Sequence, residues 1–187
     1  MAYDIITITP TLDTSAYVNT DVLFIGTEVK LPSASCKILN VKAIWDDPAS
    51  IGSATGDQVP GATFNLYFFQ NNTHAMGTIN TASSDASRIT AAQIATNIFL
   101  GAVTMTNNAS GEADLGDPTL FYQVAVGQST GSALTTGSYD PIVLESGTTK
   151  DTVYVQSILE VDPNADSGGD GLLSAADGLT ITLCVEY

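Results

Sequence analysis

The chain has 187 residues, a length typical of a single domain, and its 20 acidic residues outnumber its 5 lysines and arginines, for a formal net charge of -15. Binding to nucleic-acid phosphates or to anionic membranes needs clustered Lys and Arg, so we expect no nucleic-acid partner and no membrane partner. The 44% content of hydrophobic residues excludes a disordered acidic tail. With only 1 histidine and 2 cysteines, the chain favours a surface or assembly role, and we predict that it is not an enzyme.

Short runs of β-branched and aromatic residues, separated by polar turns, predict roughly eight or nine strands. The first run ends at Pro10, as an edge or entry strand would. The aromatic run at 64–69 favours a central strand, and the last run alternates apolar and polar residues from Leu179 to Val185. The candidate runs from which these strands are drawn, in chain order, are 5–9, 21–25, 28–31, 36–45, 64–69, 102–105, 120–126, 141–144, 152–159 and 179–185.

One short α-helix is predicted near residues 91–99. Thr90 and Gln93 have the spacing of a capping box, and Ile89 and Ile94 have that of a hydrophobic staple. Gly101 is placed to end the helix. We expect the helix to plug the side or end of a sheet core with an apolar face made of Ile94, Ala95, Ile98 and Phe99.

These elements predict one all-β domain over residues 1–187, an antiparallel β-sandwich that is jelly-roll-like. The first and last predicted strands each lie close to a terminus, and the chain shows no interior linker. Cys36 and Cys184 are predicted to be two buried free thiols in a protein made in a reducing cytoplasm, with a disulfide between them left open. The first residues lack the features of a secretory signal, and no apolar run is long enough to span a bilayer.

The acidic loop at 162–170 is the first candidate for a ligand site. Its oxygen-bearing residues alternate like the start of an EF-hand calcium loop, but Ser167 and Leu173 stand where that loop has glycine and glutamate. A solvated turn is the favoured interpretation. The alternative left open is a looser Ca²⁺ site made of Asp162, Asp166 and Asp170.

Other polar residues offer weaker candidates for chemistry. Two carboxylate pairs, Asp46 with Asp47 and Asp114 with Asp117, have the composition of a glycosidase site, but each stands beside a proline and is typical of a turn. His74 is predicted to be a surface histidine, because a metal site or a triad would need further partners. We therefore assign no catalytic, cofactor-binding or metal-binding residue.

Aromatic side chains raise the possibility of a sugar-stacking face. They fall inside predicted strands, so packing in the core is the favoured interpretation. The residues concerned are Tyr67, Phe68, Phe69, Phe121 and Tyr122.

Several apolar segments, in their order along the chain, resemble virion structural proteins of tailed bacteriophages of marine and aquatic bacteria. They are 21–24, 36–45, 66–70, the capped helix leading into 101–103, 120–122 and 177–183. The resemblance implies a capsid decoration or cement protein, a small β-sandwich seated on the phage head and often trimeric. It implies no catalytic residues, and the acidic loops at 107–117 and 162–170 have no counterpart in it.

The resemblance leads to the expectation of a protein that binds and stabilises the major coat lattice. Its partners would be the major capsid protein and itself, as a homotrimer. It would be located on the exterior of the virion capsid after synthesis in the cytoplasm of the host bacterium. Residues 1–9, short and β-prone, form a possible docking strand. The alternatives are a carbohydrate-binding or tail-fibre β-sandwich module, or another minor virion component.

Overall fold

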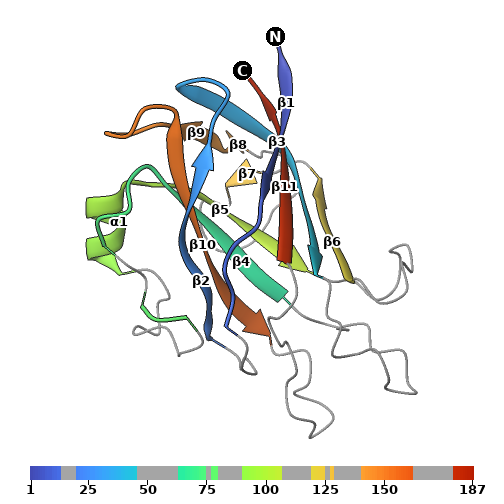
Figure 1. Ribbon diagram of the computed structural model, residues 1–187, viewed down its shortest axis with the longest axis vertical. Helices are drawn as coiled ribbons and strands as arrows, with labels where there is room; N and C mark the ends of the chain where they lie inside the picture. Colours follow the sequence, from blue (N-terminus) through green and yellow to red (C-terminus); the bar gives the residue numbers. More distant parts are fainter. Residues whose placement is uncertain are drawn as a thin grey trace, which may run out of the picture.

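The structure is a computed structural model that describes residues 1–13, 20–45, 63–74, 77–79, 90–106, 119–124, 127–128, 140–161 and 179–187. This part of the chain is mostly strand with one short helix, which confirms the all-β prediction (Figure 1). The elements are β1 (Tyr3–Ile8), β2 (Val22–Lys30), β3 (Ser35–Trp45), β4 (Thr63–Phe69), α1 (Ala91–Asn97), β5 (Phe99–Thr106), β6 (Thr119–Val124), β7 (Gly127–Gln128), β8 (Asp140–Pro141), β9 (Val143–Glu145), β10 (Thr152–Val161) and β11 (Leu179–Glu186).

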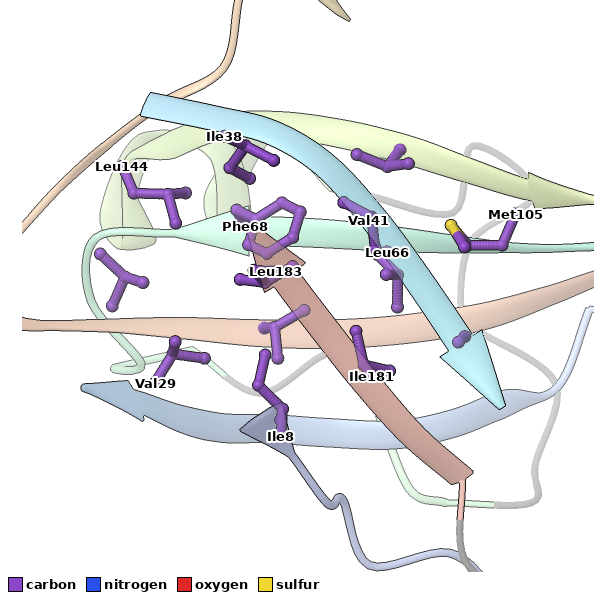
Figure 2. Packing of buried hydrophobic residues seen from close by; sticks show 14 of the residues in the cluster. Ile8, Val29, Ile38, Val41, Leu66, Phe68, Met105, Leu144, Ile181 and Leu183 are labelled. Atoms are coloured by element: carbon purple, nitrogen blue, oxygen red, sulfur yellow. The ribbon is translucent and has the colours of Figure 1, made fainter. Parts of the chain in front are cut away.

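The strands form two main sheets, and every pairing between the described strands is antiparallel. The first sheet has the order β1-β11-β3-β6, and β9 also pairs with β3. The second sheet has the order β2-β10-β4-β5, and the short strands β7 and β8 pair with each other. The two main sheets stack in a sandwich-like arrangement, with β3 and β11 crossing over β4 and β10 (Figure 2).

The hydrophobic core lies between the two sheets. In β11, Leu179, Ile181, Leu183 and Val185 are buried while the residues between them are half-buried, as the period of two predicted. Ile38 and Leu183 of the first sheet meet Phe68 of the second in this core (Figure 2).

The aromatic strand β4 lies inside the second sheet, between β10 and β5, as predicted. Its side chains alternate between the two faces of that sheet. Phe68 points into the core, whereas Tyr67 and Phe69 pack with Ile158 in a smaller cluster outside it. All three aromatic side chains are buried in one of the two clusters, which confirms packing inside the protein over an exposed sugar-stacking face, while the side chains of Phe121 and Tyr122 lie outside the described part.

The two ends of the chain meet in the first sheet. β1 is the edge strand that the sequence predicted, and its neighbour is the last strand, β11. Beyond the strand ends, Ala2 and Tyr187 exchange two backbone hydrogen bonds of 3.0 Å (Figure 1). The 1–9 segment, predicted as a docking strand, therefore pairs within its own chain from Tyr3 to Ile8.

The helix is present where it was predicted, but its expected role in the core is wrong. In α1 every residue with a described side chain is exposed except Asn97, which is fully buried. Ile94 remains 48% exposed instead of plugging the core. A polar side chain, not an apolar face, therefore anchors this helix.

The predicted helix end at Gly101 is also wrong. The helix ends at Asn97, and Ile98 follows with a φ of 56°, in the left-handed region. Gly101 lies within β5, opposite Phe68 of β4. The chain leaves the helix early because Gln70 and Asn71 donate backbone hydrogen bonds to the carbonyls of residues 98 and 97, which ties the helix end to the end of β4.

Two other boundaries differ from the prediction. The runs at 21–25 and 28–31 form one strand, β2, which stays paired with β10 across a bulge. The run at 141–144 is divided between β8 and β9, which pair with different strands. Pro141 has no N–H to continue a ladder, which accounts for the break.

Candidate functional site

One face of the first sheet points away from the core and is open to solvent. Residues that face each other across an antiparallel pair lie on the same side of a sheet, so the strand registers define this face. We call it the outer face. It consists of Tyr3, Ile5, Thr7, Ser35, Lys37, Asn40, Lys42, Ile44, Val143, Glu145, Thr180, Thr182, Cys184 and Glu186, all half-buried or exposed.

The strand registers arrange these residues in rows across the sheet. Glu186 of β11 lies between Tyr3 of β1 and Lys37 of β3, and Lys37 faces Val143 of β9. A parallel row passes from Ile5 to Cys184 and on to Asn40, and another from Thr7 through Thr182 to Lys42. The face is thus a continuous surface over four strands.

Apolar side chains are distributed over this face. Tyr3 is 62% exposed, Ile5 67%, Ile44 40% and Val143 45%. Three of the four are β-branched, which suits them to a pleated strand surface even without burial. Contiguous exposed apolar groups mark surfaces that contact other proteins, and on this face Tyr3 and Ile5 are neighbours on β1.

The charges on the outer face are nearly balanced, although the chain as a whole is strongly acidic. Lys37 and Lys42 are two of its 5 cationic residues, and Glu145 and Glu186 are the carboxylates among the described residues of this face. Lys37 Nζ lies 3.9 Å from a carboxylate oxygen of Glu186, a partly solvated pair that stabilises the sheet little. A surface with few charges is easier to desolvate against a partner.

Both cysteines are free, as predicted, but only Cys36 is buried. Burial raises the pKa of the Cys36 thiol to about 11, because the thiolate would lose its hydration. Cys184 is half-buried on the outer face, opposite Ile5. The two thiols therefore differ in accessibility.

A cluster of polar hydrogen bonds lies around α1. Asn97 Oδ1 accepts hydrogen bonds from the Thr73 amide at 3.0 Å, the Thr73 hydroxyl at 3.1 Å and the His74 amide at 2.9 Å. Asn97 Nδ2 donates to the His74 carbonyl at 2.6 Å. The His74 backbone is fixed while its side chain is exposed, so the structure places this residue at the surface.

The remaining candidates from the sequence are not brought together by the described part of the chain. Asp46, Asp47, Asp114, Asp117 and the acidic loop 162–170 lie outside the described residues. Among the residues that are described, no group of three or more His, Cys, Asp or Glu side chains is arranged to hold a metal ion. No helix in the same part is long and apolar enough to cross a membrane.

Comparison with known proteins does not identify a family for this chain. No protein-family model matches the chain, and no curated protein matches it significantly.

Proposed function

We propose that this protein is a capsid decoration protein of a tailed bacteriophage, which binds the major coat lattice from the exterior of the virion through its outer face. The observation that supports this proposal is the solvent-open sheet face, with Tyr3, Ile5, Ile44 and Val143 exposed on an otherwise acidic chain. The resemblance of its apolar segments to phage virion proteins supports the same class.

A sheet face is well suited to such a contact. Its side chains are already held by the strand ladders, so little conformational entropy is lost when a partner binds. Apolar groups in the contact supply affinity, and the threonines around them supply hydrogen bonds at the rim. A weak contact made by many copies on a regular shell gives strong total binding. On that basis the protein would reinforce the shell by bridging neighbouring coat subunits.

We also propose that the fold is a jelly roll. The pairs β1–β11, β2–β10, β3–β6 and β4–β5 are nested, as in one long hairpin folded at its middle. Further pairing of β11 with β3 and of β10 with β4 rolls that hairpin into two sheets. Viral capsid and lectin domains both use jelly rolls, so the topology supports a virion role without selecting it.

In this proposal the 1–9 segment contributes to docking as part of the first sheet. Because β1 is paired with β11 along its whole length, it would dock as the margin of the outer face and not as a free arm. The homotrimer implied by the resemblance would use two different patches of each copy, because a cyclic trimer is built from head-to-tail contacts.

The test is co-sedimentation of the purified protein with empty shells assembled from major coat proteins of tailed phages. A double variant, Ile44→Asp with Val143→Asp, places carboxylates in the apolar part of the outer face without touching the core. We expect the wild-type protein to bind saturably and the variant to lose affinity by about 30-fold or more. The matched control is Ile94→Asp on α1, an exposed isoleucine away from this face, which should bind like the wild type.

Two outcomes would contradict the proposal: no binding of the wild-type protein to shells, or equal binding by the double variant.

The rival interpretation is a carbohydrate-binding or tail-fibre module, for which the exposed Tyr3 ring offers a stacking surface. Calorimetry with a glycan panel, in the presence and absence of Ca²⁺, separates the two. Saturable binding of a glycan without binding to shells would favour the rival.

A further inference from the structure

The outer edge of β1 carries backbone groups that the sheet does not use. In an antiparallel pair, hydrogen-bonded and non-hydrogen-bonded residue pairs alternate. Ala2 and Tyr187 exchange both backbone hydrogen bonds, so Asp4, Ile6 and Ile8 are the residues of β1 that bond to β11. The N–H and C=O groups of Tyr3, Ile5 and Thr7 must then point away from β11, toward the free edge.

The side chains agree with this assignment. The Ile5 amide donates to its neighbour's carboxylate, Asp4 Oδ1, at 2.8 Å instead of to a strand. Tyr3, Asp4, Ile5 and Thr7 are all exposed. Among the described strands, only β11 pairs with β1. An apolar edge strand with unused donors and acceptors is a template for another strand.

The sequence of β1 can pair with itself in an antiparallel register that brings no like charges together. Opposed residues must share a face, and a two-fold axis through Ile5 meets this condition, with Ile5 facing Ile5 of a second copy. Tyr3 then faces Thr7, and Asp4 faces Ile6, so the only charged residue of the strand meets an apolar one. Moving the register by two residues toward the N-terminus would instead place the two Asp4 carboxylates opposite each other, which is unfavourable.

We propose that β1 pairs with β1 of a second copy about a two-fold axis through Ile5. The N–H and C=O of Ile5 then form the central hydrogen-bonded pair, and the Ile5 amide exchanges its hydrogen bond to the Asp4 carboxylate for one to the Ile5 carbonyl of the second copy. The two first sheets become one continuous sheet with one continuous outer face. The few charges on this edge make it a suitable meeting place for two chains that each carry a net charge of -15.

A two-fold contact uses the same strand of both partners, so each assembly that is completed by it contains an even number of chains. A trimer formed through other surfaces would be doubled by it. The inference therefore goes beyond the proposed coat contact, and it is tested on the isolated protein without any shell.

The first experiment measures the molar mass of the full-length protein by sedimentation velocity from micromolar to near-millimolar concentration. We expect an even number of chains at high concentration, and half that mass for Ile5→Pro, which removes an N–H that the β1–β11 ladder does not use. A second variant, Ile5→Lys, places a charge at the edge that opposes strand pairing, and it provides the same test if the proline variant does not fold. Ile44→Lys, on the same face but away from the edge, is the control and should keep the wild-type mass.

The second experiment traps the pair. In a Cys184→Ser background, which removes the thiol facing residue 5, Ile5→Cys should form a disulfide-linked dimer under mild oxidation, because hydrogen-bonded partners lie about 5.5 Å apart between Cα atoms. Thr182→Cys, one strand away from the edge, should not. A wild-type mass of one or three chains, an unchanged mass in Ile5→Pro and Ile5→Lys, or equal cross-linking at residues 5 and 182 would each overturn the proposal.

Discussion

At the scale of single residues, two neighbouring polar side chains of β10, Gln156 and Ser157, are buried without hydrogen-bond partners in the described part of the chain. Gln156 of β10 is fully buried, and within the described part of the chain neither its amide nitrogen nor its amide oxygen has a hydrogen-bond partner. It lies opposite Tyr67 on the face of the second sheet that points away from the main core. Burying an unpaired amide is unfavourable, so this position lowers the stability of the fold.

We predict that Gln156→Met raises the free energy of unfolding by roughly 1–3 kcal/mol, because methionine has a similar length and no group to desolvate. Urea denaturation followed by circular dichroism measures the change. Gln70→Met is the matched control, since Gln70 Nε2 donates to the Ser146 carbonyl at 3.4 Å and should gain no stability on replacement. A loss of stability in Gln156→Met would contradict the prediction and point to a role for the amide.

The two thiols give a pH-dependent prediction. Burial raises the pKa of Cys36 from 9.0 to about 11, so at pH 8 its thiol stays protonated and unreactive in the folded protein. We expect Ellman's reagent to label Cys184 rapidly and Cys36 only after unfolding. Because the folded state holds the Cys36 proton more tightly, its contribution to stability is complete below pH 9 and is lost as the pH rises through about 11. Equal labelling rates in the folded protein would contradict this assignment.

At the scale of elements, α1 is attached by hydrogen bonds and not by packing. Ile94 and Ile98 are 48% and 45% exposed, whereas Asn97 is buried and makes four hydrogen bonds to residues 73 and 74. The spacing of the apolar residues correctly predicted a helix, but spacing alone does not say whether a sheet lies beneath it. The spacing of apolar residues therefore could not predict that an asparagine, and not an apolar side chain, attaches this helix to the rest of the protein.

We predict that Asn97→Ala lowers the free energy of unfolding by roughly 1–3 kcal/mol, since it removes this anchor and leaves backbone groups of His74 without their partners. Asn72→Ala is the control. Asn72 is exposed, and its Nδ2 donates a 3.5 Å hydrogen bond to the Gly26 carbonyl, so its loss should change stability by less than about 0.5 kcal/mol. Equal effects of the two substitutions in urea denaturation would show that the Asn97 cluster has no special role.

At the scale of the whole molecule, the charge is the dominant property. A net charge of -15 repels itself within the folded state, and dissolved salt screens that repulsion. On the outer face Lys37 and Lys42 balance Glu145 and Glu186, so the contacts proposed above would lie where the local net charge is small.

We predict that the thermal midpoint rises as sodium chloride is increased from low ionic strength to physiological ionic strength, where the Debye length is about 8 Å. Differential scanning calorimetry measures the change. Choline chloride at the same ionic strength should have the same effect, because screening does not depend on the cation. A falling midpoint in both salts would mean that attractive ion pairs outweigh the repulsion.

The sequence by itself determined the class of fold and the buried face of the last strand, β11. In β11 the alternation from Leu179 to Val185 is a local pattern, and any sheet that uses one face must bury those residues. Only the tertiary structure decided that β11 lies beside β1, that the outer face stays open, and that Asn97 anchors α1. Strand neighbours are chosen by contacts between distant parts of the chain, and these depend on the combined packing of both sheets. A single strand's pattern states which side is apolar, but not what will cover it.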